Sequence, residues 1–549
     1  MIRAGEYSSW EEACARFRWQ QPAQYNLAED VCGRHAVKNP DAVALIYEPT
    51  PGRARSYTFA ELDQLARRFA NVLEALGVQR GDRVAIIMPQ RPEALVAHLG
   101  IYKAGAVAVP LSKLYAPRAL EYRLEHSGTC VVVADAANAA KVDEIASTLP
   151  GLRHLLVVDS GVTPVRDFAK HLGRAGERHS AGETCGEDPA MTLYTSGTTG
   201  PPKGSLEVHR KLIGFIPPFQ LLHNFAPRPH DVYWTPADWA WVGGLFDLLL
   251  TAWWCGCPVV GTAQDRFDPE EAFALMARHR VTGVFLPPTA LRMMMEVPNP
   301  HRFRLALRTI TSGGEPVNPE IVGWAREVLD VPVHEFYGQT ETTFYVGNCS
   351  ALFPVRPGSM GRVFPGYRVR IMDEEGREVP DGEVGEIGVH RDAPSVFLEY
   401  WKDPDATRQK FAGEWFRTGD TARRDEDGYL WFQGRNDDLI KSAAYRIGPA
   451  EVEAAMVTHP GVAEAAAVGS PGPIRGQIVK AFIRLKAGAV ASPGLVTEIQ
   501  ETVKQRLAAH QYPRGIEFVE DFPRTTTGKI KRSELREREV NRKEAGERP

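Results

Sequence analysis

The sequence lacks the features of a disulfide-stabilised, zinc-binding or nucleic-acid-binding protein. Its 549 residues include only seven cysteines, an odd number scattered along the chain, so a framework of paired disulfides is not expected. Cys255 and Cys257 form a C-x-C pair, but no second pair or nearby histidine completes a zinc site. We therefore interpret them as buried free thiols. The net charge of -4 gives no basic excess that would attract nucleic acid or an anionic membrane.

Long hydrophobic runs are also missing. The N-terminal residues contain no basic region followed by an apolar stretch, which is the pattern of a secretory signal. The most apolar segment, Trp239 to Gly261, carries Asp247 and is interrupted by Gly256 and Pro258. This pattern predicts a buried helix followed by a core strand rather than a membrane span. We expect a cytoplasmic protein, monomeric or homodimeric, without an integral membrane segment.

What is present is an ordinary globular composition in a long chain. Hydrophobic residues make up 43% of the sequence and charged residues 24%, which is far from the composition of disordered proteins. Single hydrophobic cores stop growing at about 250–300 residues, so the length indicates two or more domains.

Helical and strand patterns alternate over the first four-fifths of the chain. Residues 58–76 carry apolar side chains at helical spacing, residues 83–88 form a short apolar run, and residues 93–104 are helical again. Such alternation predicts an α/β fold, with a large N-terminal domain of parallel sheets sandwiched by helices.

The pattern changes near residue 360 to short strands separated by turns such as DEEG, PDGE and DEDG. We expect a β-rich subdomain over about 360–434 that completes an N-terminal domain of residues 1–434. The charged segment 435–438 is the candidate hinge, and residues 439–549 are predicted to form a small C-terminal α+β domain. The elements expected in that domain are a helix, two strands and a second helix, at 449–458, 462–468, 478–485 and 494–508.

The string Tyr194-Thr-Ser-Gly-Thr-Thr-Gly-Pro-Pro-Lys-Gly204 is the strongest local motif. Its glycines allow backbone N–H groups to turn toward one point, its hydroxyl side chains add donors, and Lys203 adds a cation. This combination suits a nucleoside triphosphate, whose dispersed negative charge needs many donors. The spacing is G-x-x-G-x-x-K and no Ser or Thr follows the lysine, so the string is not a Walker A loop.

With this string, the sequence resembles the adenylate-forming superfamily of acyl-CoA synthetases, nonribosomal adenylation domains and luciferases. The resemblance extends from about residue 25 to 535. Further stretches match the family's pattern in the same order, and they are Ser312-Gly-Gly-Glu-Pro316, Tyr337-Gly-Gln-Thr-Glu341, Thr418-Gly-Asp420, Gly434-Arg-Asn-Asp-Asp438 and Thr527-Gly-Lys-Ile530. The resemblance implies a reaction in which ATP activates a carboxylic acid as an acyl-adenylate.

The resemblance also implies roles for individual residues. Glu341 matches a glutamate that binds Mg²⁺, and a hard oxygen donor in a polar turn suits that ion. Lys529 matches the lysine of the adenylation step, where a point charge neutralises the reacting oxygens. Thr195 is the third expected catalytic residue. The full set expected to bind the nucleotide is Thr195, Ser196, Gly197, Thr198, Thr199, Gly200, Lys203, Gly313, Gly314, Glu315, Tyr337, Gln339, Thr340, Asp420, Arg435, Arg446 and Lys529.

A two-step mechanism with a mobile C-terminal domain is implied as well. In the family this domain rotates about an aspartate, matched here by Asp437, between adenylation and thioester formation. The residues expected to contact coenzyme A are Ala444, Arg475, Lys504 and Tyr512. Ala444 replaces the glycine usual in relatives and narrows the channel for the pantetheine arm. For the other three positions, a solvated surface role is an equal alternative.

The expected acyl pocket contains Trp239, Trp241, Gly243 and Gly338. Acetate-specific relatives typically carry Trp at the position of Gly338, so the glycine is expected to open space for an acid larger than acetate. The two tryptophans predict an apolar wall, and core packing of this pair is an equal alternative. Together these features predict a short- to medium-chain, branched or aromatic acid.

The sequence therefore predicts an AMP-forming acyl-CoA synthetase that uses ATP, Mg²⁺ and coenzyme A. One alternative is an adenylation enzyme that loads a carrier protein. More distant alternatives are a luciferase-like oxidase and a nucleotide-binding regulator without catalytic activity.

Overall fold

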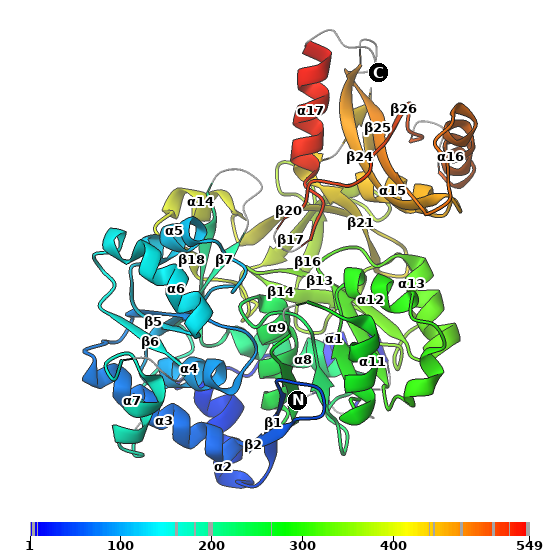
Figure 1. Ribbon diagram of the computed structural model, residues 1–549. Coiled ribbons are helices and arrows are strands. Elements are labelled where there is room, and N and C mark those ends of the chain that lie inside the picture. The colour runs from blue at the N-terminus through cyan, green and yellow to red at the C-terminus, as the bar shows by residue number, and fades with distance from the viewer. Residues whose placement is uncertain are drawn as a thin grey trace. The chain divides into compact units, whose positions relative to one another are not determined.

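The computed structural model of the protein is shown in Figure 1. The structure describes residues 2, 6–7, 9–159, 163–179, 183–195, 201–264, 266–438, 440–442, 445–472, 476–507, 511–525 and 528–544. The chain forms two compact units, which we call the first and the second unit. The first comprises Met1–Pro357, Val363–Arg368 and Arg391–Gln409, and the second comprises Gly358–Arg362, Val369–His390 and Lys410–Pro549. The predicted hinge at 435–438 lies within the second unit.

One sheet of the first unit has seven strands in the order β18-β8-β7-β4-β3-β5-β6. The strands are β3 (Arg83–Ile87), β4 (Val107–Pro110), β5 (Thr129–Ala134), β6 (His154–Val157), β7 (Pro189–Thr195), β8 (Lys203–Val208) and β18 (Glu399–Tyr400). Pairing is parallel from β7 to β6, and β8 and β18 extend the edge in antiparallel fashion. The predicted strand at residues 83–88 is confirmed as β3.

Helices cover this sheet on both faces (Figure 1). They are α3 (Phe59–Ala75), α4 (Pro92–Lys103), α5 (Pro117–Ser127) and α6 (Ala136–Ile145). Helix α3 begins at a capping box, in which Thr58 and Glu61 exchange side-chain and backbone hydrogen bonds. Leu120 of α5 and Val142 of α6 pack against one face of β3 and β5 in a continuous buried core. The predicted alternation of helices with parallel strands is therefore confirmed.

The other strands of the first unit run in the order β14-β13-β12-β11-β9-β10-β1-β2. They are β1 (Val43–Glu48), β2 (Arg55–Thr58), β9 (Tyr233–Trp234), β10 (Val259–Thr262), β11 (Gly283–Phe285), β12 (Thr309–Gly313), β13 (Val333–Gln339) and β14 (Thr343–Gly347). Pairing is parallel from β13 to β1 and antiparallel for β14 and β2. The helices beside these strands are α8 (Lys211–Leu222), α11 (Pro269–Arg278), α12 (Pro288–Met295) and α13 (Pro319–Trp324).

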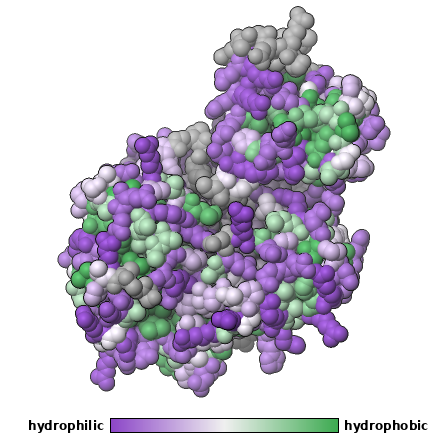
Figure 2. All heavy atoms as spheres, viewed as in Figure 1, coloured by the Kyte–Doolittle hydropathy of each residue, from purple (hydrophilic) through white to green (hydrophobic). Residues whose placement is uncertain are grey.

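The most apolar segment forms a buried helix and a core strand, as predicted. The helical part is α9 (Val242–Gly244), the π-helix η3 (Leu245–Leu250) and α10 (Thr251–Trp254), and β10 follows it. Within the described ranges, no helix combines the length and the hydrophobicity needed to cross a membrane. Hydrophilic residues dominate the face seen in Figure 2, with hydrophobic residues scattered among them.

The second unit contains two antiparallel arrangements of strands. The first has the order β16-β17-β20-β21-β15, with β15 (Gly361–Val363), β16 (Val369–Met372), β17 (Val384–His390), β20 (Trp415–Arg424) and β21 (Tyr429–Arg435). The second has the order β23-β22-β25-β24, with β22 (Ile440–Ser442), β23 (Tyr445–Ile447), β24 (Val462–Gly472) and β25 (Gly476–Leu485). Unlike these strands, β26 (Gly515–Phe518) pairs with β25 in parallel fashion. Helices α15 (Pro449–Val457), α16 (Pro493–Arg506) and α17 (Arg532–Glu544) accompany the latter. The β-rich stretch and the C-terminal α+β elements are thus confirmed.

The remaining elements are short. They are α1 (Trp10–Arg16), η1 (Glu29–Gly33), α2 (Arg34–Lys38), η2 (Ala146–Thr148), α7 (Phe168–Arg174), η4 (Pro300–Phe303), η5 (Ala325–Leu329), α14 (Pro404–Gln409), β19 (Phe411–Ala412) and η6 (Asn436–Asp438).

Candidate active site

The β7–β8 hairpin brings two of the predicted phosphate-binding residues together. Thr195 ends β7 and lies opposite Lys203, which begins β8. The Thr195 hydroxyl donates to the Lys203 carbonyl at 3.5 Å. The other predicted residues of this loop are Ser196, Gly197, Thr198, Thr199 and Gly200, and they lie outside the described residues.

Glu341 lies at the same edge of the first unit and is held in place by hydrogen bonds. It is 8% exposed. The Tyr400 hydroxyl donates to Glu341 Oε1 at 2.6 Å, and the Phe397 N–H donates to the Glu341 carbonyl at 2.7 Å. Lys203 Nζ lies 5.2 Å from the centre of the Tyr400 ring, so the lysine and the glutamate contact the same tyrosine.

This arrangement fits a magnesium ion. Within the described part of the chain, Glu341 Oε2 accepts no hydrogen bond, so one carboxylate oxygen remains for a ligand. Mg²⁺ is commonly bound by one or two carboxylates together with water and substrate phosphates rather than by a cage of protein ligands. Among the described residues no group of three or more His, Cys, Asp or Glu side chains is arranged to hold a metal. A single carboxylate near Lys203, the lysine predicted to bind phosphate, is consistent with both observations.

The turn after β12 carries three residues predicted to bind the nucleotide, and its backbone is open at Gly314. Gly314 has a φ of +86°, and no atom lies within 4 Å of the position that a Cβ would occupy. A Cβ on the preceding Gly313 would instead meet the Phe336 ring at 2.7 Å. Glu315 Oε2 lies 3.7 Å from Arg292 Nη2.

The end of β13 carries the three other residues predicted for this part of the site. The Tyr337 ring contacts Tyr345 edge-on with centroids 5.5 Å apart. Gln339 is the last residue of β13, and the carbonyl of Thr340 accepts a hydrogen bond from Lys211.

Glu335 is a candidate residue that the sequence patterns did not reveal. It lies in β13 opposite Ser312 of β12, beside the glycine turn. Burial raises its pKa to about 8, although the Val317 N–H donates to its Oε1 at 3.2 Å. The signal in the sequence is weak, because it consists of one acidic residue within a short strand-like segment, Val333–Gln339.

Gly338, which was predicted to line the acyl pocket, lies where two strands approach closely. The position that a Cβ would take overlaps the carbonyl of Thr343, because β13 and β14 shift register between Tyr337 and Gly338. A role in the acyl pocket stays a prediction, and the missing side chain has a structural role as well. It permits two backbones to approach closely at a bulge.

The two predicted tryptophans do not form one wall. Trp239 is 3% exposed and its ring packs beside Gly261 of β10. Trp241 instead contacts Tyr115 edge-on at 6.0 Å, at the core of the other sheet. No side chain or carbonyl in the described ranges accepts a hydrogen bond from the buried Trp239 Nε1–H, which leaves a donor for a ligand or water. A Cβ on Gly243 would meet the Phe285 ring at 2.9 Å.

In the second unit, Asp420 and Arg435 are direct partners across β20 and β21. Arg435 Nε lies 3.4 Å from Asp420 Oδ1, and the Asp420 carboxylate is buried. The Thr418 hydroxyl accepts a hydrogen bond from the Asp420 N–H at 3.1 Å. The carboxylate of Asp420, which was predicted to bind the nucleotide, is therefore fixed by its own strand pair.

Lys529 is exposed and lies in a turn of the second unit. The Thr525 N–H donates to the Lys529 carbonyl at 2.8 Å, and the Lys529 N–H donates to the Thr525 hydroxyl at 3.1 Å. Arg524 Nη1 supports the same turn by donating to the Gly528 carbonyl at 3.0 Å.

The structure describes some of the other residues predicted for the second unit, but not all of them. Lys504 Nζ lies 4.5 Å from the centre of the Tyr512 ring, so these two predicted coenzyme A contacts are neighbours. Ala444 and Arg475 lie outside the described residues, and for Asp437 and Arg446 only the backbone is described.

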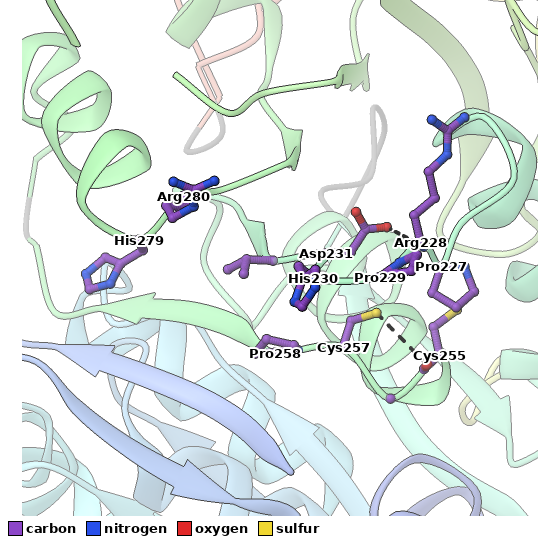
Figure 3. A pocket seen from close by; sticks show the side chains of 12 residues that line it. Pro227, Arg228, Pro229, His230, Asp231, Cys255, Cys257, Pro258, His279 and Arg280 are labelled. Atoms are coloured by element: carbon purple, nitrogen blue, oxygen red, sulfur yellow. Dashed lines mark hydrogen bonds between the residues drawn. The ribbon is translucent and has the colours of Figure 1, made fainter. Parts of the chain in front are cut away.

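A cavity of about 840 Å³ lies elsewhere in the first unit (Figure 3) and contains none of the predicted site residues. Cys255, Cys257, Asp231 and His279 are among its lining residues. The two cysteines are free thiols, as expected, and burial raises the pKa of Cys257 to about 12. A thiol with so high a pKa is a poor nucleophile near neutral pH.

The sequence is similar to those of known nucleotide-dependent enzymes. The AMP-binding enzyme family matches residues 32–401, and the AMP-binding enzyme C-terminal domain matches residues 451–529. The acetyl-coenzyme A synthetase of Bacillus subtilis is 36% identical over 544 residues, which cover 97% of this chain and 94% of that protein.

Two solved structures are similar over most of both chains. The anthranilate CoA ligase AuaEII in complex with anthranoyl-AMP has a TM-score of 0.86 and 29% identity, and the match covers 95% of this chain and 98% of that one. ATP-bound MatB from Rhodopseudomonas palustris has a TM-score of 0.82 and 28% identity, over 93% of this chain and 98% of that one. The chain belongs to the AMP-binding enzyme family, as an AMP-forming ligase of the acyl-CoA synthetase type.

Proposed function

We propose that the protein activates a carboxylic acid with Mg·ATP and transfers the acyl group to coenzyme A. The observation that carries the proposal is the placement of Glu341. Its carboxylate is nearly buried, one oxygen accepts from Tyr400, and the phosphate-binding candidate Lys203 contacts the same tyrosine. A carboxylate that is held by one oxygen is preorganised to bind a hard cation through the other.

In the first step a carboxylate oxygen of the acid attacks the α-phosphorus of ATP, and the bond to pyrophosphate breaks. Thr195 and Lys203 bind the phosphates, and Glu341 would hold a Mg²⁺ ion, which would supply screening of the phosphate charge. Lys529 neutralises the charge of the reacting oxygens. Asp420 accepts hydrogen bonds from the ribose hydroxyls, and Arg435 beside it contacts the nucleotide.

In the second step the thiolate of coenzyme A attacks the acyl carbonyl carbon, and the bond to AMP breaks. Adenylation supplies the leaving group that a free carboxylate lacks. Lys504 and Tyr512 are the described candidates for contact with the coenzyme, which carries several phosphate charges. Rotation about Asp437 between the two steps is part of the proposal.

The acid is proposed to be short- to medium-chain, branched or aromatic. The similarity to a ligase for anthranilate supports an aromatic acid. Support also comes from the apolar ring of Phe285 beside Gly243 and from the unsatisfied Trp239 N–H, which would suit an acid with a polar substituent.

The direct test is a panel of acids with purified protein, Mg²⁺ and ATP. Acetate, butyrate, isobutyrate, octanoate, benzoate and anthranilate are each supplied with and without coenzyme A, and pyrophosphate and AMP are measured. We expect AMP release that requires both an acid and the thiol, and least with acetate. Absence of AMP with every acid and thiol contradicts the proposal. Turnover with a phosphopantetheinyl carrier protein but not with coenzyme A would favour the carrier-loading alternative.

A further inference from the structure

Lys211, the first residue of α8, is a buried cation that the proposed mechanism does not use. Its side chain is completely inaccessible to solvent. Burial of a charge is costly unless partners satisfy it. Lys211 Nζ lies 2.7 Å from Glu207 Oε2, and the other oxygen of Glu207 accepts from the Ser205 hydroxyl at 2.6 Å.

The two other partners of Lys211 are backbone carbonyls. Nζ donates to the Thr340 carbonyl at 2.7 Å and to the Ser395 carbonyl at 3.1 Å. An ammonium group has three hydrogens, of which two are donated to these carbonyls, and the ion pair with Glu207 is the third polar contact. The carbonyls belong to segments that are 129 and 184 residues away from the lysine in sequence.

Both of these segments hold Glu341. Thr340 precedes Glu341 directly. Ser395 begins the stretch in which Phe397 donates to the Glu341 carbonyl and Tyr400 donates to its carboxylate. The Tyr367 hydroxyl lies 3.0 Å from Ser395 Oγ and also donates to the Gly214 carbonyl of α8, which ties the same stretch to the helix a second time.

From these contacts we infer that Lys211 is a positioning residue for the metal site. It joins the two segments that carry Glu341 and the partners of Glu341, and it thereby fixes the carboxylate before Mg·ATP binds. The inference rests on the proposed role of Glu341 as the metal ligand. It predicts that loss of Lys211 weakens metal binding even where the fold is intact.

The competing explanation is that Lys211 only neutralises Glu207. Lys103 offers a matched control, because its side chain is equally inaccessible. It pairs with Asp63 at 2.8 Å and with Glu29, and neither partner belongs to the site. A lysine that serves the fold alone should behave like Lys103.

The experiment compares Mg²⁺ binding with ATP present and no acid, so that no catalysis is required. The variant is Lys211→Met combined with Glu207→Gln, which removes both charges without leaving a buried carboxylate unpaired. Calorimetric titration of ATP at a series of Mg²⁺ concentrations gives the metal dependence, and thermal unfolding reports stability. We expect Mg²⁺ affinity to fall about tenfold, with metal-free ATP binding within about twofold of the unchanged protein.

Three comparisons decide the result. Lys103→Met should lower the melting temperature and leave the Mg²⁺ dependence unchanged, and an equal Mg²⁺ effect there would overturn the inference. Glu207→Gln alone keeps Lys211 and both carbonyl contacts, so Mg²⁺ affinity should change less than twofold. Wild-type Mg²⁺ affinity in the double variant would also overturn the inference.

Should the double variant fail to fold, Lys211→Arg keeps the charge beside Glu207 but replaces three tetrahedral donors with a planar fork. A threefold or greater loss of Mg²⁺ affinity then supports the inference, and unchanged affinity overturns it. Failure of the proposed function is distinguishable, because it would appear as the absence of AMP from the unmodified protein with every acid.

Discussion

The turn that carries Glu341 and the turn that carries Lys529 are built in opposite ways. Glu341 is nearly buried, and its partners come from residues 56 and 59 positions later in the chain. Lys529 is exposed, and its turn is closed by hydrogen bonds among residues 524 to 529. Both residues are proposed to act in the same step.

The difference between the two turns follows from the different roles proposed for Glu341 and Lys529. A carboxylate that binds a hard cation must be held in one orientation before the ion arrives, and distant segments of a folded unit can provide that rigidity. A lysine that supplies a point charge needs reach and solvation until it is used. Substitutions in the exposed Lys529 turn should therefore change activity with little effect on stability, whereas substitutions of buried residues in the first unit should also change stability.

The largest effect is expected for Lys529→Ala. Loss of a charge that stabilises the transition state should slow acyl-adenylate formation by about 10²–10³-fold. Because the side chain is exposed, the melting temperature should stay within about 1 °C. Pyrophosphate release measures the first step, and coenzyme A consumption from supplied acyl-adenylate measures the second, which should be largely spared.

Lys531→Ala is the control for this prediction, because Lys531 is a nearby lysine whose Nζ pairs with Glu534 at 2.7 Å. It should leave both half-reactions unchanged. Equal loss of both half-reactions in Lys529→Ala would contradict a role confined to adenylation.

Glu335→Gln should change stability in a pH-dependent way, because Glu335, like Glu341, is buried in the first unit. The pKa of Glu335 is about 8 in the folded protein against an ordinary value of 4.5, so between these pH values the folded state binds more protons than the unfolded state. The unmodified protein therefore loses stability as pH rises through this window, and the glutamine variant is spared that loss. The variant should gain roughly 3–4 kcal/mol relative to the unmodified protein between pH 5 and pH 8, at about 1.4 kcal/mol per unit of pKa difference.

Urea unfolding at several pH values tests this expectation. The difference between the two proteins should level off above pH 8 and nearly vanish near pH 4. A difference that does not vary with pH would mean that Glu335 has the same pKa in the folded and unfolded states, contrary to the effect expected from its burial.

Tyr400→Phe is expected to have the smallest effect. It removes the hydrogen bond to Glu341 Oε1 and retains the ring beside Phe397 and Lys203. The Mg²⁺ concentration for half-maximal pyrophosphate release should rise about 3–10-fold, which corresponds to roughly 1 kcal/mol.

Tyr25→Phe provides the matched control, because it removes a phenol–carboxylate hydrogen bond of 2.7 Å to Asp30 that lies outside the proposed site. It should leave the Mg²⁺ dependence unchanged. An equal shift in both variants would assign the effect to general loosening of the fold.

The sequence predicted the parts of the molecule that depend on local pattern. The strand at 83–88, the apolar helix before β10 and the C-terminal elements all follow from periodicity and turn residues over short windows. Motifs with fixed spacing also identified Thr195, Lys203, Glu341 and Lys529 before any geometry was known. Their catalytic roles, and the hinge at Asp437, remain predictions.

What the sequence could not provide were contacts between distant segments. The close approach of two backbones at Gly338 could not be predicted, because it depends on the register of β13 against β14, which a single strand does not reveal. Trp239 and Trp241 are two residues apart but pack on different sheets. The burial of Lys211 could not be predicted either, since a lysine after His209 and Arg210 is indistinguishable in sequence from a solvated one.

The placement of β18 has a consequence for attempts to divide the protein. Residues 391–409 belong to the first unit, although the chain enters the second unit both before and after them. A truncated protein ending at Pro357 would lack the two residues that pair with β8, together with the phenol bound to Glu341. No single cut can therefore separate the first unit intact, and a fragment made to study metal binding in isolation must extend at least through Gln409.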